Sequence, residues 1–283
     1  MLTPIVRTVE EVQAAVARAR GLGLNIGFVP TMGALHEGHA ALIRAAGLPS
    51  AFVVVSIFVN PTQFGPSEDY SKYPRSLDAD QQVCAAAGAN LIFAPSADEM
   101  YPTNAAAFVD VSKLGDALCG ASRPGHFRGV CTIVLKLFNI VAPDVAYFGA
   151  KDYQQARIIQ QMVSDLNVPV IVKVEPTVRE ADGLALSSRN RYLSAEQRAA
   201  APSIYRALQA THDRVSNGER DVSILEAGLR TELAAIPGSR IDYASIVDAE
   251  TLQPLVLLDR PAIAAVAVYL GTTRLIDNIV LGK

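Results

Sequence analysis

The chain has 283 residues, half of them hydrophobic and 19% charged, which excludes global disorder and allows a substantial core. Its formal net charge of −3 supplies no broad basic field, so we predict no nucleic-acid partner. The three cysteines are odd in number and unpatterned, and the first residues carry no secretion-signal pattern. No apolar run is long enough to span a bilayer. We therefore expect a cytoplasmic protein with free thiols and no membrane partner.

Strand and helix patterns alternate from the start of the chain to about Pro176. A capping box at Thr8–Glu11 begins a helix that stops at Gly21. The predicted elements that follow are strand 26–29, a helix starting near residue 36, strand 51–59, helix 76–87, strand 90–94, a strand from Phe108 with a short helix after it, a helix to about 141, strand 145–148, helix 153–166 and strand 170–174. This alternation predicts an α/β fold with a doubly wound parallel sheet.

The pattern changes after Pro176. Ser194-x-x-Gln197 caps a long helix that we expect to reach about Asn217, and a second helix covers 222–235. Strand-like segments follow at 241–247, 262–270 and 274–280. Two helices and a small antiparallel sheet predict a second, α+β domain. We place the larger Rossmann-like domain, which binds the substrates, at 1–177 and the smaller domain, closing over the site, at 178–283.

The stretch Val29–His39 reads Val-Pro-Thr-Met-Gly-Ala-Leu-His-Glu-Gly-His. His36 and His39 stand three residues apart at the start of a helix, so both rings project from one face, toward the free N–H groups of the helix N-terminus. This arrangement favours a phosphate site. A capping role is the ordinary alternative for a histidine at a helix start. Zinc is disfavoured, because metalloprotease histidines are four apart and no third clustered His or Cys follows.

Three further polar clusters follow predicted strands: Asn60 with Gln63, the segment Gly149–Gln155, and the loop Ser187–Arg189. Because ligands bind beyond the carboxyl ends of parallel strands, we expect these clusters to lie with the histidines. Lys151, in the segment Gly149–Gln155, suits a phosphate clamp, and the serine-arginine loop suits closure over a triphosphate. Each cluster also has an ordinary interpretation as capping residues or a solvated loop. The dinucleotide fingerprint and the P-loop are absent.

The short motif His36-Glu-Gly-His39 resembles the signature of the nucleotidyltransferase and class I aminoacyl-tRNA synthetase superfamily. The longer string Pro30–His39 resembles, much more narrowly, the pantoate–β-alanine ligase (pantothenate synthetase) family. The resemblance extends over nearly the whole chain through the strings Phe58–Gly65, Tyr73–Arg75, Arg123–Phe127, Phe148–Gln154 and Leu186–Asn190. It implies a Rossmann-like fold of the HIGH type. We interpret Arg123–Arg128 as a structural loop near the site.

The resemblance implies a magnesium- and ATP-dependent ligase of pantothenate biosynthesis, on the coenzyme A pathway. Pantoate's carboxylate would attack the α-phosphorus of ATP, releasing pyrophosphate and leaving an enzyme-bound pantoyl adenylate. The amine of β-alanine would then displace AMP and give pantothenate. The family also suggests a homodimer formed through the N-terminal domain.

Two alternatives stay open. A nucleotidyltransferase could join AMP or CMP to a small phosphorylated acceptor, although neutral Gln63 and Gln155 suit such an acceptor poorly. A nucleotide-sensing module without turnover is the non-enzyme alternative. It would be expected to have lost a histidine, lysine or arginine from the four clusters, and all are present.

The resemblance also assigns roles to residues. Its implied catalytic set stabilises charge on the phosphates, with His39 as the protonated donor, and consists of His36, His39, Lys151 and Arg189. The implied pantoate-binding residues are Gln63, Gln155 and Asn60, and the implied Mg²⁺ ligand is Asp80. The implied ATP-binding residues are Pro30, Met32, Gly33, His36, His39, Gly149, Lys151, Asp152, Val178, Leu186, Ser187, Ser188 and Arg189.

Overall fold

The structure, a computed structural model, describes residues 2–65, 70–71 and 73–282 and divides into two compact units. The first unit consists of Met1–Gly115, Arg123–Ala150 and Gln155–Pro176. The second unit consists of Asp116–Ser122, Lys151–Gln154 and Thr177–Lys283. Two short segments that we expected in the first domain therefore cluster with the second unit.

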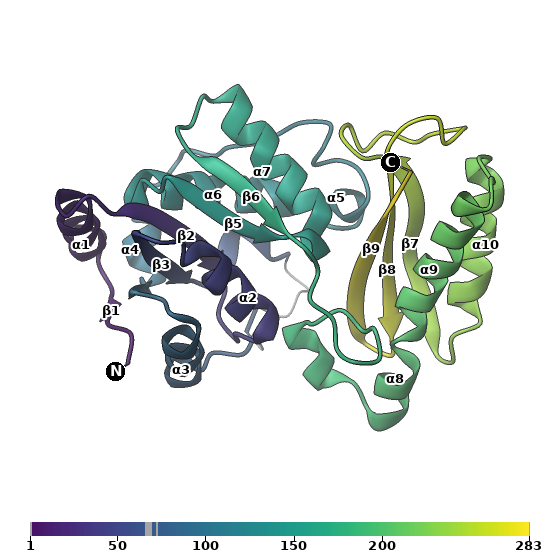
Figure 1. The fold of residues 1–283 in the computed structure, drawn as a ribbon, viewed down its shortest axis with the longest axis horizontal. Helices are drawn as coiled ribbons and strands as arrows, with labels where there is room; N and C mark the ends of the chain where they lie inside the picture. The colour runs from purple at the N-terminus through teal and green to yellow at the C-terminus, as the bar shows by residue number, and fades with distance from the viewer. Residues whose placement is uncertain (1, 66–69, 72, 283) are drawn as a thin grey trace. The chain divides into compact units, whose positions relative to one another are not determined.

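The first unit contains a six-stranded parallel sheet in the order β1-β4-β3-β2-β5-β6 (Figure 1). The strands are β1 Ile5–Val6, β2 Asn25–Thr31, β3 Ala51–Ile57, β4 Leu91–Phe93, β5 Val145–Gly149 and β6 Ile171–Glu175. The accompanying helices are α1 Val9–Gly21, α2 Glu37–Ala46, η1 Pro61–Gln63, α3 Leu77–Ala87, α4 Ala97–Met100, α6 His126–Val141 and α7 Tyr153–Asp165. The predicted α/β class with a parallel sheet is confirmed.

The strand order creates a switch point beside β2. The chain builds β2, β3 and β4 side by side and then places β5 against the other edge of β2. In a parallel sheet, a ligand crevice forms where the strand order reverses, beyond the carboxyl ends of the two strands concerned. The loop before α2 leaves β2 at this point, and β5 ends here at Gly149. In the middle of the sheet, Val53, Val54 and Val55 of β3 are buried, as predicted for a strand covered on both faces.

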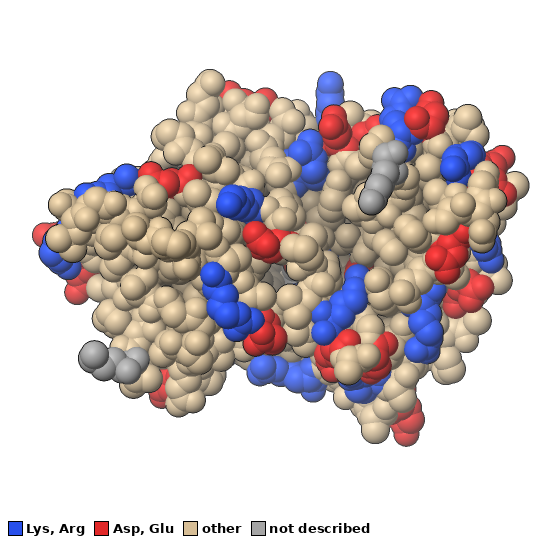
Figure 2. All heavy atoms as spheres, in the orientation of Figure 1, with Lys and Arg blue, Asp and Glu red and all other residues tan. Residues whose placement is uncertain are grey.

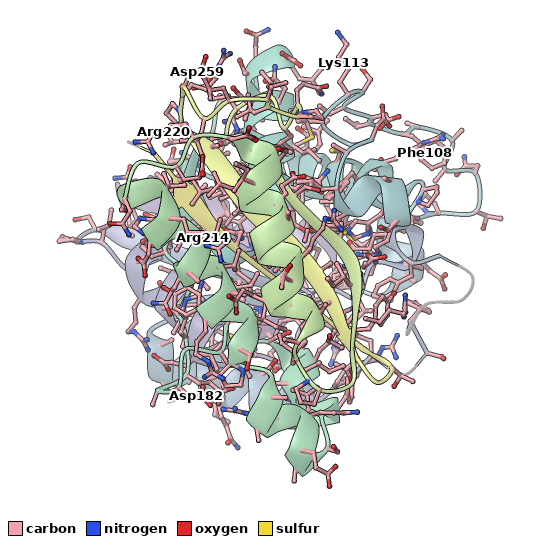
Figure 3. All side chains as sticks on the ribbon, turned by 90° about the vertical axis from the view of Figure 1, so that its right-hand side faces the viewer. Phe108, Lys113, Asp182, Arg214, Arg220 and Asp259 are labelled. Carbon is pink, nitrogen blue, oxygen red and sulfur yellow. The ribbon has the colours of Figure 1, made fainter. Side chains whose placement is uncertain are left out.

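The second unit contains an antiparallel sheet in the order β7-β8-β9, with β7 Ser239–Asp248, β8 Ala262–Leu270 and β9 Thr273–Leu281. Its helices are α5 Cys119–Ser122, the 3₁₀ turn η3 Ser188–Tyr192, α8 Ala195–Ala200, α9 Ser203–Ser216 and α10 Val222–Ala234. It also contains the last two residues of the 3₁₀ turn η2 Ala150–Asp152 and the first two residues of α7. Leu208 of α9, Leu225 of α10 and Val266 of β8 belong to one buried core. Arg214, labelled in Figure 3, extends from α9 to pair with Glu232 of α10 at 3.9 Å.

Two predicted elements differ from the structure. The strand expected at Phe108 is wrong, because the N–H of Val109 donates to the Thr132 hydroxyl at 2.9 Å instead of entering a ladder. The single long helix expected after Ser194 is wrong as well. The chain forms α8 and α9 with Pro202 between them, since proline lacks the N–H that a continuous helix needs. The capping boxes at Thr8 and Ser194 are both confirmed.

Positive and negative side chains are interspersed on the face drawn in Figure 2. Among the described residues, no helix has the length and apolar character needed to cross a membrane. Cys84, Cys119 and Cys131 are free and buried, as expected. Burial, the largest cause, raises the pKa of Cys84 and of Cys131 to about 12. Both therefore stay as neutral thiols at neutral pH.

Candidate functional site

His36 and His39 form a reciprocal cap at the start of α2. The Nδ1 of His36 accepts the N–H of Gly38 at 3.2 Å, and the Nδ1 of His39 accepts the N–H of His36 at 3.3 Å. The ring centroids are 4.2 Å apart, so the rings lie side by side as their spacing predicts. Because both Nδ1 atoms accept, the proton of each neutral ring is on Nε2. The capping role considered from the sequence is therefore confirmed for both histidines.

The loop before His36 has a demanding backbone. Gly33 and Ala34 follow one another with φ of +81° and +51°, a region that residues other than glycine rarely enter. Asp80 of α3 holds this loop: its Oδ1 accepts the N–H of Leu35 at 2.7 Å and its Oδ2 accepts that of Ala34 at 3.0 Å. The Asp80 carboxylate is thus engaged by consecutive backbone amides.

This geometry does not fit the expected Mg²⁺ ligand. Asp80 is only 3% exposed, whereas protein-bound Mg²⁺ usually keeps several waters. Among the described residues, no group of three or more His, Cys, Asp or Glu side chains is arranged to hold a metal ion. Both Asp80 oxygens instead accept backbone N–H groups of the loop.

A second cluster lies after β3, where Asn60 is buried and its amide is used within the protein. Its Nδ2 donates to Gln63 Oε1 and to Gly129 O, each at 3.1 Å. Its Oδ1 accepts from the hydroxyls of Tyr101 at 2.8 Å and Thr62 at 3.0 Å. Asn60 therefore organises the turn η1 around Gln63.

Gln63 itself extends toward the histidine loop, since its Nε2 contacts Met32 Sδ at 3.0 Å. The loop at Arg123 and His126 supports its backbone. Because a guanidinium only donates, the 3.0 Å contact from Arg123 Nη1 makes His126 Nε2 an acceptor. His126 Nδ1 then donates to the carbonyl of Gln63 at 2.8 Å. These contacts are in keeping with our interpretation of this segment as a structural loop near the site.

The third cluster is the segment Gly149–Gln155, of which Lys151–Gln154 belong to the second unit. The carbonyl of Lys151 accepts from Asn278 Nδ2 at 2.9 Å, and its ammonium lies 3.5 Å from Asp152. Gln154 is buried and binds the backbone of the preceding segment through Ala117 O and Cys119 N. Gln155, the predicted substrate residue, is half-buried on α7.

The Ser187–Arg189 loop is braced by ion pairs. Arg179 makes a two-pronged contact with buried Asp277, at 2.6 and 2.9 Å, and stacks on Tyr205 with 3.5 Å to the ring centroid. Arg198 bridges Glu180 and Asp182 on the same loop. The loop is therefore held at a defined position in the second unit.

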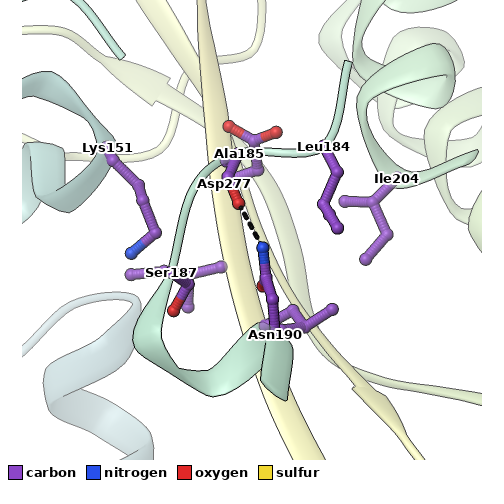
Figure 4. Close-up of a pocket in the computed structure, with 9 residues that line it drawn as sticks. Lys151, Leu184, Ala185, Ser187, Asn190, Ile204 and Asp277 are labelled. Carbon is purple, nitrogen blue, oxygen red and sulfur yellow. Dashed lines mark hydrogen bonds between the residues drawn. The ribbon is translucent and has the colours of Figure 1, made fainter. Parts of the chain in front are cut away.

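A small pocket in the second unit brings the third and fourth clusters together, with Lys151, Ser187, Asn190 and Asp277 in its lining (Figure 4). Ser187 caps η3 by accepting the N–H of Arg189 at 3.2 Å. Asn190 donates to Ala185 O at 3.1 Å, which keeps the loop closed. An ammonium and a hydroxyl beside one another form an arrangement that can bind anionic oxygens.

Sequence reasoning missed the residues that position this chemistry. Asp80 accepts backbone amides of the histidine loop, Tyr101 and Gly129 bind the side chain of Asn60, Gln154 binds the backbone at Ala117, and Arg179 pairs with Asp277. Each joins segments far apart in the chain. A buried acid in the first turn of α3 was the one visible signal, and it was interpreted as a metal ligand.

The family model for pantoate-beta-alanine ligase matches residues 4–280. The chain is 55% identical to pantothenate synthetase of Moorella thermoacetica, covering 98% of both chains. It is 58% identical to that of Pseudomonas putida strain W619, covering 97% of this chain and 96% of the relative.

Solved structures agree. Pantothenate synthetase from Thermus thermophilus superposes with a TM-score of 0.93 at 48% identity, covering 98% of this chain and 99% of the other. A pantoate-beta-alanine ligase from Francisella tularensis, complexed with beta-gamma ATP and beta-alanine, has a TM-score of 0.79 at 35% identity and coverage of 98% and 97%.

The fold and these matches define a ligase with a Rossmann-like parallel sheet. The chain belongs to the pantoate–β-alanine ligase family, and it is an enzyme of that class.

Proposed function

We propose that the protein condenses pantoate with β-alanine at the expense of ATP, through an enzyme-bound pantoyl adenylate. Family membership across residues 4–280 supports the overall reaction. The ATP analogue and β-alanine in the Francisella relative support the substrates. The observation that carries the proposal furthest is the paired cap of His36 and His39, which holds two imidazoles side by side at a helix N-terminus, a place that favours phosphate oxygens.

In the first step, a carboxylate oxygen of pantoate attacks the α-phosphorus of ATP. A new P–O bond forms, the bond between the α-phosphorus and the bridging oxygen breaks, and pyrophosphate leaves. Nucleotidyl transfer asks the protein chiefly for positioning and charge stabilisation. We assign these tasks to His36, His39, Lys151, Ser187 and Arg189. Among these residues we assign the donor role to His39, as the family resemblance implies.

ATP would enter as its Mg²⁺ complex, in which the phosphates themselves supply oxygen ligands. The remaining ATP contacts that we propose are those implied by the sequence: Pro30, Met32, Gly33, Gly149, Asp152, Val178, Leu186 and Ser188. Asp80 is left out of the metal set because its oxygens accept backbone amides.

Pantoate would lie against Gln63 and Gln155, whose neutral amides suit a hydroxy acid. We assign Asn60 to positioning Gln63, since its own amide is already bonded to Gln63, Gly129, Thr62 and Tyr101. In the second step the amine of β-alanine attacks the carbonyl carbon of the adenylate, the C–O bond to phosphate breaks, and AMP leaves.

We further propose that the enzyme works in the cytoplasm as a homodimer. Three buried free thiols are in keeping with a reducing compartment. The oligomeric state can be measured by light scattering of the purified protein: a mass of twice 30.1 kDa supports the dimer, and a single-chain mass rejects it.

The adenylate is tested by isotope transfer. With pantoate and without β-alanine, labelled pyrophosphate should exchange into ATP. Pantoate labelled with ¹⁸O in its carboxylate should deliver one label to AMP when β-alanine is added. Product formation without exchange, and without ¹⁸O in AMP, would reject the adenylate and leave a different activation route.

A further inference from the structure

The carboxylate of Asp80 reaches from α3 to the loop that precedes the histidines. It accepts two consecutive backbone amides, those of Ala34 and Leu35, at 3.0 and 2.7 Å. Both of these residues are buried, so their N–H groups depend on a protein acceptor. One side chain therefore satisfies two amides whose direction is fixed by the loop.

The loop needs such a partner because its backbone is unfavourable. Gly33 and Ala34 both have positive φ, and alanine enters this region only where the surroundings enforce it. A Cβ at Gly33 would lie 2.9 Å from Asp80 Oδ2 and 3.1 Å from Ile57 Cγ2, so the loop packs directly on the carboxylate. Packing and hydrogen bonding thus restrain the same residues.

The clamped segment is joined to His36 by one peptide bond. The N–H of His36 donates to His39 Nδ1, and the Nδ1 of His36 accepts from Gly38. A shift of residues 34 and 35 would carry the His36 backbone with it and break the reciprocal cap. Both imidazoles therefore depend on the clamp for their orientation.

The position of Asp80 on α3 favours a negative charge. It lies in the first turn of α3, where the helix N-terminus favours negative charge. Asp78 shares that turn and is exposed, which makes it a matched control.

We propose that Asp80 is a positioning residue, which holds the 34–35 backbone so that His36 and His39 face the ATP phosphates, and that it does not bind Mg²⁺. The assignment to ATP rests on the proposed function. The clamp itself can be tested without turnover.

Asp80→Asn keeps the shape of the side chain but turns one acceptor into an N–H₂ group that faces a backbone N–H. We expect the variant to fold and its kcat to fall at least tenfold, with little change in the KM for pantoate. The Mg²⁺ concentration that gives half-maximal rate at fixed ATP should match that of the wild type. Asp78→Asn should behave as wild type in all three measurements. Recovery of Asp80→Asn by raised Mg²⁺ or Mn²⁺ would overturn the proposal in favour of a metal ligand.

Histidine ¹⁵N spectra of the unliganded protein provide the readout that is independent of activity. The wild type and Asp78→Asn should show His36 and His39 as Nε2–H tautomers, and Asp80→Asn should change both signals. Unchanged signals would refute the clamp, even if the enzyme proved to use other substrates. An inactive wild type with the expected spectra would instead reject the proposed function and retain the clamp.

If Asp80→Asn does not fold, wild-type protein still tests the metal assignment. Mn²⁺ added without ATP should leave the His36 ring signals sharp. Selective broadening of these signals at low Mn²⁺ would place a metal at Asp80 and contradict the proposal.

Discussion

His126 Nδ1 donates to the carbonyl oxygen of Gln63 at 2.8 Å, which joins the start of α6 to the turn that carries the proposed pantoate amide. The same turn lies on Gly129, where an added Cβ would be 2.4 Å from Thr62 O and 2.7 Å from Gln63 N. Both contacts are to main-chain atoms, which cannot rotate away. The position of Gln63 is therefore set by α6.

Gly129→Ala should displace η1 and with it Gln63. We expect a loss of roughly 1–3 kcal/mol in the free energy of unfolding from overpacking. We also expect kcat/KM for pantoate to fall on the order of tenfold to a hundredfold, because small misplacements of binding groups are costly. Steady-state kinetics and thermal unfolding measure the two effects. Gly21→Ala is the control, since nothing lies within 4 Å of its added Cβ. A Gly129→Ala enzyme with wild-type pantoate kinetics would contradict the coupling.

His39→Ala should lower kcat about a hundredfold or more, near 3 kcal/mol for one lost donor to a developing charge. His36→Ala should do the same and also lose a helix cap, at about 1 kcal/mol of stability. Rapid-quench measurement of AMP formation tests the first effect, and denaturant unfolding the second. His212→Ala, on the exposed face of α9, should change neither. A normal rate in either active-site variant would remove that histidine from the catalytic set.

Lys151→Ala should raise the KM for ATP more than the KM for pantoate, because the ammonium serves as a phosphate clamp. The substitution keeps the backbone carbonyl that accepts from Asn278, so we expect the fold to stay intact. Initial rates with each substrate varied in turn separate the two constants. Lys173→Ala, an exposed lysine on β6, is the matched control. Equal changes in both constants would argue that Lys151 acts on something other than ATP.

Asp277→Asn should loosen the loop that carries Ser187 and Arg189. It leaves Arg179, whose side chain is 17% exposed, without its anionic partner. Breaking a buried pair from one side costs roughly 3–5 kcal/mol. Hydrogen exchange should then report faster opening of residues 178–190 than in the wild type. Asp259→Asn breaks an exposed pair with Arg260 and should have little effect. Loss of stability without faster exchange in this loop would contradict the bracing role.

Acid should destabilise the protein through its hydrogen-bonded carboxylates. The hydrogen bond from Arg198 lowers the pKa of Asp182, which lies on the surface (Figure 3), from an ordinary value of 3.8. The Ser223 hydroxyl does the same for Asp221. A lowered folded pKa means that the folded protein binds fewer protons, so this stabilisation is present above pH 3.8 and is lost as pH falls through the folded values. Unfolding midpoints measured from pH 6 to 2 should decline below about 4, and Asp182→Asn should flatten the decline. An identical slope in wild type and variant would exclude Asp182 as a contributor.

Local patterns predicted much of the fold. Thr8 with Glu11, and Ser194 with Gln197, marked helix starts because a capping box is complete within four residues. The continuous β-branched run of β3 also indicated a central strand, because that pattern is contained within the strand itself. The strand predicted from Phe108 was wrong, because the N–H of Val109 donates to a side chain on α6. A contact between such distant segments leaves no local pattern in the sequence.

The residues of the site also differ in whether their contacts are local in the sequence. His36 and His39 could be recognised because their spacing within one helix start determines their geometry. The roles of Asp80 and Asn60 could not, since the partners that define them lie on other elements. A carboxylate that accepts backbone amides and one that binds Mg²⁺ look alike in a sequence. Only the direction of the N–H groups around them differs.

The central claim is that this protein joins pantoate to β-alanine, and product analysis tests it most directly. Purified protein should be incubated with ATP, Mg²⁺ and pantoate, with and without β-alanine, and the products separated by chromatography. We expect AMP and pantothenate in equal amounts only when all substrates are present. ATP binding without pantothenate, or transfer of AMP to a phosphorylated acceptor instead, would contradict it.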